Sequence, residues 1–243
     1  MTFPDPFQDL VPTARDLRHM PEEYRQAVEK VVTSHAVNEL TGAQTFDEPA
    51  IRLAPSPFYK WMVSRVTMEE YGHHVLFSRL ADDLGVDWRP KRPLTLFDYP
   101  LVSWAEFGVV KAIVDLAEIL QLEDLEACTY GPLRQIARRT MPEERFHVGL
   151  GRKIVQDLWA RPGARDEVTA AFHKLFPVTL AFFGRADSAN NRTYLRWGIK
   201  RRTNAEMRRE YVRRVRAYAA ELAIPLPPIP PEYADEHLEE VSP

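Results

Sequence analysis

Apolar residues recur at intervals of three and four along most of the chain, a spacing that predicts helices rather than strands. The first predicted helix begins at Pro21, a residue suited to a first helical turn, and extends to about Gln44. The second covers Phe58 to Leu84 and stops at Gly85, because glycine readily adopts the left-handed conformation that ends helices. We expect the buried stripe of the first helix to consist of Ala27, Val31, Ala36 and Leu40.

Prolines predict the breaks between the helices. Three prolines mark residues 47–57 as a connection, and three more forbid a continuous helix over residues 87–100. Residues 1–19 contain several prolines and are expected to be irregular. Pro142 falls inside a predicted helix, where it removes one backbone hydrogen bond and favours a kink.

The remaining helices follow from the same pattern. A third begins at Ser103, a good N-cap with Glu106 three residues later, and runs to Gln121. A fourth begins at about Leu125 or Gly131 and ends at Trp159. A fifth covers residues 167–184, residues 187–191 form a loop, and a basic helix covers residues 203–223 before a proline-rich, acidic tail. The chain is therefore predicted to be all-α.

Composition adds limits to this picture. The chain has 243 residues, is 45% hydrophobic and 28% charged, and suits one globular domain. Its net charge of −3 argues against a general nucleic-acid binder. The single cysteine, Cys128, excludes an intramolecular disulfide and a cysteine-ligated cluster. No signal peptide or apolar stretch of membrane-spanning length is visible, so a cytoplasmic protein without membrane association is expected.

Two Glu-x-x-His motifs carry the candidate chemistry. Glu70 with His73 lies on the second predicted helix, and Glu144 with His147 lies on the fourth. Residues three apart share one face of a helix, so each pair can converge on one metal ion. Two such pairs, with one carboxylate from each of two further helices, form the di-iron site of ferritin-like four-helix bundles.

Glu39 on the first helix and Asp115 on the third supply the lone carboxylates. Four carboxylates balance the charge of two Fe²⁺ ions, which explains how such a cluster of acids can be buried. We therefore predict an all-α, ferritin-like four-helix bundle with additional C-terminal helices, organised as a single domain. The four-helix bundle occupies residues 20–160, the additional helices residues 161–223, and the tail residues 224–243.

Other interpretations of these residues stay open. One Glu-x-x-His is expected by chance in a chain of this length, and surface ion pairs would give the same pattern. His74 can replace His73, Glu118 can replace Asp115, and Glu69 can be a metal ligand or a solvated charge. His35 fits a residue that packs or bonds beside the ligands.

Several stretches beyond the motifs resemble the catalytic subunit of bacterial ring-1,2-phenylacetyl-CoA epoxidase, a multicomponent monooxygenase of phenylacetate catabolism. They are SHAVNELTGAQ, EEYGHHVLFSRLADDLG, FDYPLVSWAEFGVVKAIVDLAEI, CTYGPLRQIARRTMPEERFHVGLG and LRWGIKRRTNAEMRREYV, in the family's order between residues 25 and 215. The resemblance implies a metal-ligand set, which is also the catalytic set, of Glu39, Glu70, His73, Asp115, Glu144 and His147. The chain differs from the family in its shorter length, in Pro142 and at Thr67-Met68.

The resemblance implies a di-iron oxygenase that inserts one atom of O₂ into the ring of an aryl-CoA. Carboxylate and histidine ligands also admit manganese. The chain has neither a flavin or NAD fingerprint nor cysteines for an iron–sulfur cluster, so electrons are expected from a separate reductase. A hetero- or homo-oligomer and a related ferritin-like structural subunit are further expectations. The alternatives are a non-catalytic structural subunit of such a complex and a rubrerythrin-type di-iron oxidase.

Arginine and lysine are suited to the phosphates of a CoA ester, and they are concentrated in residues 192–216. We expect substrate contacts from Arg65, Lys200, Arg201 and Arg202, although a solvated face or a subunit interface explains the basic segment equally well. Near the metals, an apolar pocket is expected from Tyr71, Phe77, Phe107, Ile113 and Phe146, each of which also suits an ordinary core.

Overall fold

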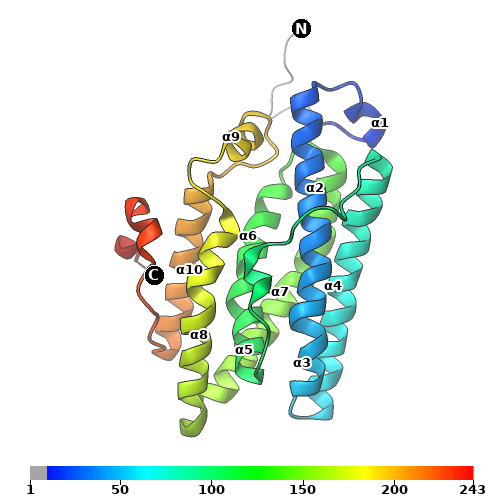
Figure 1. The fold of residues 1–243 in the computed structure, drawn as a ribbon. Coiled ribbons are helices and arrows are strands. Elements are labelled where there is room, and N and C mark those ends of the chain that lie inside the picture. The colour runs from blue at the N-terminus through cyan, green and yellow to red at the C-terminus, as the bar shows by residue number, and fades with distance from the viewer. Residues whose placement is uncertain (1–9, 243) are drawn as a thin grey trace.

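The computed structural model describes residues 10–242, and these residues form the predicted all-helical, ferritin-like fold (Figure 1). No β-strand forms within residues 10–242. Four long helical segments pack side by side, and two further long helices lie against one side of them. The bundle segments are α2 (Glu22–Gly42), α4 (Pro57–Leu84), α5 (Trp104–Val109) continued by α6 (Asp115–Leu125), and α7 (Gly131–Trp159).

The two additional long helices are α8 (Arg165–Thr179), which packs on α5, and α10 (Asn204–Leu222). Short helices fill the connections: α1 (Ala14–Leu17), α3 (Glu48–Leu53) and α9 (Ala189–Arg196). The tail runs back along α10 and inserts Leu238 into the core. No helix in the described part of the chain is long and apolar enough to cross a membrane.

The helix ends follow the expected local chemistry. Gly85 ends α4 in the left-handed conformation, with a φ of 72°. The hydroxyl of Ser103 accepts a hydrogen bond from the backbone N–H of Glu106 at 3.1 Å, so the predicted N-cap of α5 is present. Thr203 and Glu206 form a reciprocal capping box at the start of α10.

Four local predictions were wrong. Residues 48–53 are helical rather than a connection, because Pro49 occupies the first turn of α3, where a missing N–H is tolerated. Residues 14–17 and 189–196 are also helical, since Thr13 and Ser188 cap the two short helices with their hydroxyls. Leu40 of the expected buried stripe is only half-buried.

Two further expectations were based on prolines, one at Pro142 and one in residues 1–19. Pro142 lies inside α7, which continues through it from Gly131 to Trp159. Residues 1–9 of the segment that was expected to be irregular lie outside the described residues.

Two π-helical segments interrupt the bundle where the candidate site lies. Residues 43–47 lead from α2 into α3, and residues 110–114 lead from α5 into α6. Each wide turn shifts the register of the side chains that follow it. Gly151 of α7 lies against the second segment so closely that an added Cβ would be 2.4 Å from the backbone nitrogen of Ala112. Only glycine permits this backbone contact, which brings α7 close to Asp115.

Candidate metal centre

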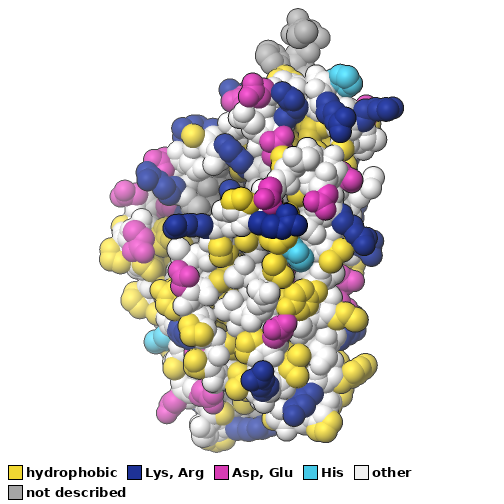
Figure 2. All heavy atoms as spheres, turned by 45° about the vertical axis from the view of Figure 1, so that its right-hand side comes forward, with side chains coloured by type: hydrophobic (Ala, Val, Ile, Leu, Met, Phe, Trp, Pro, Cys, Tyr) yellow, Lys and Arg dark blue, Asp and Glu magenta, His cyan; other side chains and the backbone are white. Residues whose placement is uncertain are grey.

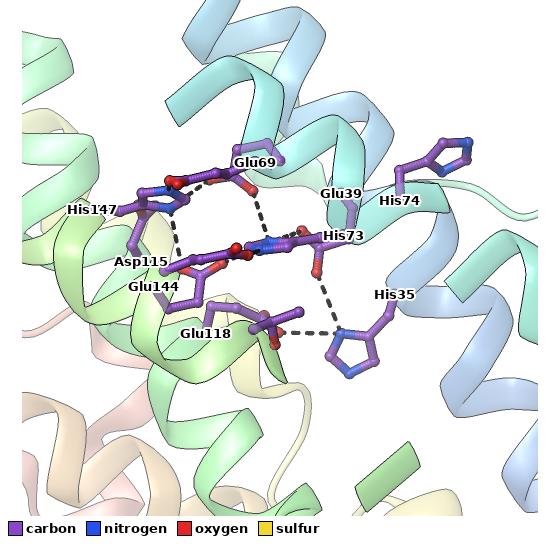
Figure 3. A network of polar contacts seen from close by, with 12 residues as sticks. His35, Glu39, Glu69, His73, His74, Asp115, Glu118, Glu144 and His147 are labelled. Carbon is purple, nitrogen blue, oxygen red and sulfur yellow. Dashed lines mark hydrogen bonds and ion pairs between the residues drawn. The ribbon is translucent and has the colours of Figure 1, made fainter. Parts of the chain in front are cut away.

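Six acidic and histidine side chains converge in the interior of the bundle (Figure 3). Each of the four bundle segments contributes to the cluster, and all six side chains are buried. The residues are Glu39 from α2, Glu70 and His73 from α4, Asp115 from α6, and Glu144 and His147 from α7.

The six residues form two overlapping groups of possible ligands. Glu39, Glu70, His73 and Glu144 each offer an atom within 4.8 Å of the others, and so do Glu70, Asp115, Glu144 and His147. Glu70 and Glu144 belong to both groups. The cluster therefore has two adjacent groups of donors that fit two metal ions and share two carboxylates.

The orientation of the two imidazoles fits metal binding. His73 places Nε2 2.8 Å from Glu143, and His147 places Nε2 2.9 Å from Glu69. Each Nδ1 is buried beside a carboxylate of the cluster, yet has no aligned hydrogen-bond partner within the described residues. A histidine whose Nε2–H is held by a carboxylate presents the lone pair of Nδ1 to a metal. The donor set and its two unsatisfied nitrogens therefore fit a pair of metal ions.

The first glutamate of each Glu-Glu-x-x-His sequence orients the histidine of the other. Glu69 bonds His147 on α7, and Glu143 bonds His73 on α4. The interpretation of Glu69 as a solvated charge was wrong, because its carboxylate is mostly buried and paired. The pair of adjacent glutamates in both motifs was visible in the sequence. The sequence did not show that Glu69 pairs with a histidine 78 residues away.

Neither alternative ligand belongs to these two groups. His74 points away from the cluster, contacts Trp88 and bonds the carbonyl of Ala36 at 2.7 Å (Figure 3). Glu118, one turn beyond Asp115, lies 3.2 Å from His35 and forms a third group of possible ligands with His35 and Glu39, which also belongs to the first group.

Lys111 is one of the residues of the cluster, with Asp47 and Glu143, that sequence reasoning missed. Its buried ammonium lies 2.9 Å from Asp47, 2.8 Å from Glu70 and 3.1 Å from Asp115. Lys111 and Asp47 come from the two π-helical segments. A lysine within the apolar run from Phe107 to Asp115 was the only sequence signal.

Burial and proximity set the charges of the cluster. Burial alone lowers the pKa of His73 and His147, but hydrogen bonds to the surrounding glutamates raise both well above the ordinary range. Burial raises the pKa of Asp47 to about 7, against the attraction of Lys111. Burial likewise raises the pKa of Asp115 well above its usual range. Without metal, protons and Lys111 supply the positive charge that the carboxylates require.

Two cavities with part of their lining in common lie beside the cluster. The inner one, of about 60 Å³, is bounded by four of the carboxylates and by the rings of Phe46, Phe97 and Phe182. The outer one, of about 220 Å³, is lined by Lys30, Lys91 and Lys200 among others. Both cavities are lined by Asn38, Glu118 and Phe182.

The apolar residues expected in the pocket lie outside this lining. Phe77, Phe107 and Ile113 are fully buried core residues, and Phe146 packs beneath the guanidinium of Arg65. Tyr71 bonds Glu48 near the surface. Their helical spacing placed them near the motifs but could not tell which side chains leave space between them.

The four basic residues that were expected to contact the substrate lie in different surroundings. Lys200 lines the outer cavity and bonds Gln121. Arg202 bonds Asp124 at 2.7 Å and the carbonyl of Leu120, whereas Arg201 is exposed apart from a backbone bond to Asp124. Arg65 lies on the outer face of α4, paired with Glu69 at 2.8 Å.

Comparison with known proteins identifies a family and a relative of this chain. The family model described as phenylacetic acid catabolic protein matches residues 11–240. The chain is 30% identical over 206 residues to one of the subunits of 1,2-phenylacetyl-CoA epoxidase from Escherichia coli (strain K12). That alignment covers 79% of this chain and 66% of the length of the relative. The chain belongs to the family of phenylacetic acid catabolic proteins.

Proposed function

We propose that this chain is the oxygenase subunit of a multicomponent monooxygenase that inserts one atom of O₂ into the ring of an aromatic acyl-CoA, as in phenylacetyl-CoA ring epoxidation. The observation that carries the proposal is the pair of imidazoles, each fixed through Nε2 and offering Nδ1 to a buried set of four carboxylates. The relative's name, which is that of an epoxidase component, supports the reaction class.

The residues that would hold two iron ions are Glu39, Glu70, His73, Asp115, Glu144 and His147, and the same set admits manganese. Bound iron would supply the redox chemistry that O₂ activation requires. The chain's own part is positioning. Glu69 and Glu143 hold the imidazoles in one tautomer, and the buried carboxylates keep the charge of the site balanced.

The cavities suggest how an aryl-CoA is placed. The rings of Phe46, Phe97 and Phe182 border the inner cavity, where they can hold an aromatic ring beside the ligands. The three lysines of the outer cavity can attract the phosphates of CoA. Lys200 is the sequence candidate that lines this cavity, while Arg65 and Arg202 are occupied by carboxylates. We therefore propose that the aromatic ring of the substrate lies nearest the cluster, the acyl thioester farther out, and the CoA phosphates at the outer cavity.

The proposed reaction needs partners. When one oxygen atom of O₂ enters the substrate and the other leaves as water, two electrons and two protons are needed in addition to the substrate. A separate reductase that supplies these electrons is therefore part of the proposal. A related ferritin-like structural subunit is proposed because the relative is named as one component of a larger enzyme. The alternative, that this chain is itself the non-catalytic component, is disfavoured by the complete set of six buried donors.

Metal analysis tests the centre. Protein purified and reconstituted without oxygen should contain about two irons per chain, and Glu70→Ala or His147→Ala should lose iron while keeping the helical circular dichroism. His74→Ala is the matched control, because His74 is adjacent to the motif but outside the cluster. Protein that binds no iron after reconstitution, or a His147→Ala variant that binds as well as the control, would refute the assignment.

Substrate binding is tested separately. Lys200→Met should weaken binding of phenylacetyl-CoA without changing that of phenylacetate, because only the CoA ester carries phosphates. Lys153→Met, on the exposed face of α7, is the control. Equal affinities of Lys200→Met and the control for phenylacetyl-CoA would remove the outer cavity from the proposal.

A further inference from the structure

The inner cavity is smaller than the aromatic ring that the proposed function places in it. Its volume is about 60 Å³, whereas an engineered apolar cavity that binds benzene has about 150 Å³. Protein interiors are closely packed, so this space does not enlarge unless a side chain moves. An aromatic ring can therefore enter only when part of the lining turns aside.

Three residues line both cavities and so form the boundary between them: Asn38, Glu118 and Phe182. The side-chain oxygen of Asn38 accepts a hydrogen bond from the backbone N–H of Leu94 at 3.2 Å. Glu118 lies 3.2 Å from His35. Phe182 is half-buried and contributes only an apolar ring. It is therefore the boundary residue that can turn without breaking a hydrogen bond or an ion pair.

The other two rings that border the inner cavity hold each other in place. Phe46 is 3% exposed and lies in the π-helical segment that follows α2. Its ring packs against that of Phe97, with the two centroids 5.6 Å apart. Phe97 also lies against Gly42 of α2, where an added Cβ would be 3.5 Å from its ring. Because Phe46 and Phe97 pack as one unit, neither can turn without displacing the other.

The backbone on both sides of Phe182 is fixed by a buried arginine. Arg208 of α10 is 1% exposed and donates hydrogen bonds to the carbonyl oxygens of Leu180, at 2.9 Å, and of Gly184. These two carbonyls lie two residues before and two residues after Phe182. The next side chain, Phe183, is buried in the core. A movement of Phe182 is therefore a rotation of its side chain on a fixed segment.

We propose, on the basis of the proposed function, that Phe182 is a specificity-determining residue. Its ring turns aside to admit the aromatic ring of an aryl-CoA, and the space that it then leaves sets the largest ring that the site accepts. With Phe182 turned aside, the inner cavity joins the outer one, of about 220 Å³. The aromatic ring then lies beside the carboxylates, and the acyl thioester passes through the boundary.

The aromatic ring could instead stay in the outer cavity. The residues that line this cavity include none of the six candidate ligands. A ring held there would lie on the far side of Phe182 from the cluster, so it would not reach the metals. The proposed reaction therefore requires the inner cavity, and Phe182 separates the two positions.

Equilibrium binding of three CoA esters to the purified, Mn²⁺-loaded chain tests the proposal. Acetyl-CoA has no ring and reports on the contacts with CoA alone, while phenylacetyl-CoA and 1-naphthylacetyl-CoA carry a small and a large ring. Phe182→Ala should bind 1-naphthylacetyl-CoA at least tenfold more tightly than the wild type, because the boundary is open. Phe182→Trp should bind phenylacetyl-CoA at least tenfold more weakly, because the larger side chain fills the space. Both variants should bind acetyl-CoA as the wild type does.

Phe58→Ala is the matched control. Phe58 is 58% exposed at the start of α4, and Figure 2 shows that apolar side chains gather over the lower half of this face. The control should leave all three affinities unchanged. If the wild type binds phenylacetyl-CoA and the Phe182 variants discriminate among the esters no differently from the control, the proposal fails while the proposed function stands. A wild type that binds none of the three esters would refute the proposed substrate class and this proposal with it.

Stopped-flow association distinguishes a side chain that turns from a fixed wall. Binding is slower where a conformational change is required, so Phe182→Ala should raise the association rate constant of phenylacetyl-CoA at least threefold. Phe97→Ala enlarges the inner cavity but does not line the outer one, and it should leave this rate constant unchanged. Equal rate constants for the wild type and Phe182→Ala, or a larger effect of Phe97→Ala, would overturn the proposal.

Discussion

Lys111 offers the sharpest test of how the candidate centre is stabilised. Its ammonium contacts three carboxylates, of which Glu70 and Asp115 belong to the second group of possible metal ligands. A metal ion bound at that position would therefore compete with the lysine for the same oxygens. We predict that Lys111→Met destabilises the metal-free protein and strengthens metal binding.

The magnitude follows from burial. Lys111 is 2% exposed, and removing one partner of a buried ionic network costs about 3–5 kcal/mol. Bound divalent ions would neutralise the same carboxylates. In the metal-bound protein the substitution should therefore lower the free energy of unfolding by only about 1 kcal/mol, which is typical of a modest core change. Folding and metal binding share a thermodynamic cycle, so the difference of about 3 kcal/mol should appear as roughly 100-fold tighter metal binding.

Urea unfolding, followed by circular dichroism, measures the loss of unfolding free energy in the metal-free protein and in the Mn²⁺-bound protein. Calorimetric titration with Mn²⁺ measures the affinity independently. Lys153→Met is the matched control, since Lys153 pairs with Asp157 on the surface and should lose less than about 1 kcal/mol in both states. Equal losses for Lys111→Met with and without metal would refute the competition between lysine and metal.

Three further outcomes are expected. Glu69→Gln and Glu143→Gln should each weaken Mn²⁺ binding by about 10- to 100-fold in calorimetry, because each replaces the charged acceptor of one Nε2–H with a neutral amide; unchanged affinity would show that the imidazoles need no carboxylate support. The metal-free protein should lose stability in urea unfolding as pH rises above about 6.5. The imidazoles, whose pKa values are raised on folding, stabilise it fully below about 6.5 and lose that contribution at higher pH; a flat profile would contradict their raised pKa values. The buried carboxyl of Asp47, whose pKa is raised to about 7, adds a loss that begins near its unfolded value and is complete by about pH 7. Gly151→Ala should lower the free energy of unfolding by about 1–3 kcal/mol through its clash with the π-helical segment, whereas Gly149→Ala, in open space on the same helix, should be neutral or stabilising; similar effects of the two would rule out the close approach.

Local sequence chemistry determined the helices and most of their ends. The limits of α4, the cap at Ser103 and the capping box at Thr203 depend on residues within one turn of each other, so they could be predicted without a fold. The same holds for the spacing within each Glu-x-x-His motif. Where proline was taken only as a breaker, as at Pro49, the prediction failed because proline also starts helices.

The assembly of the centre was decided by the tertiary structure. Glu69 with His147 and Glu143 with His73 join residues far apart in the chain, and their pairing depends on how α4 and α7 face each other. Lys111 enters the cluster because a π-helical segment, held against Gly151, turns its side chain inwards. Helical periodicity assigns side chains to faces of one helix, but the contacts between faces depend on packing at the crossings. The doubled glutamates of the two motifs were therefore visible in the sequence, while their exchange of partners existed only in the folded bundle.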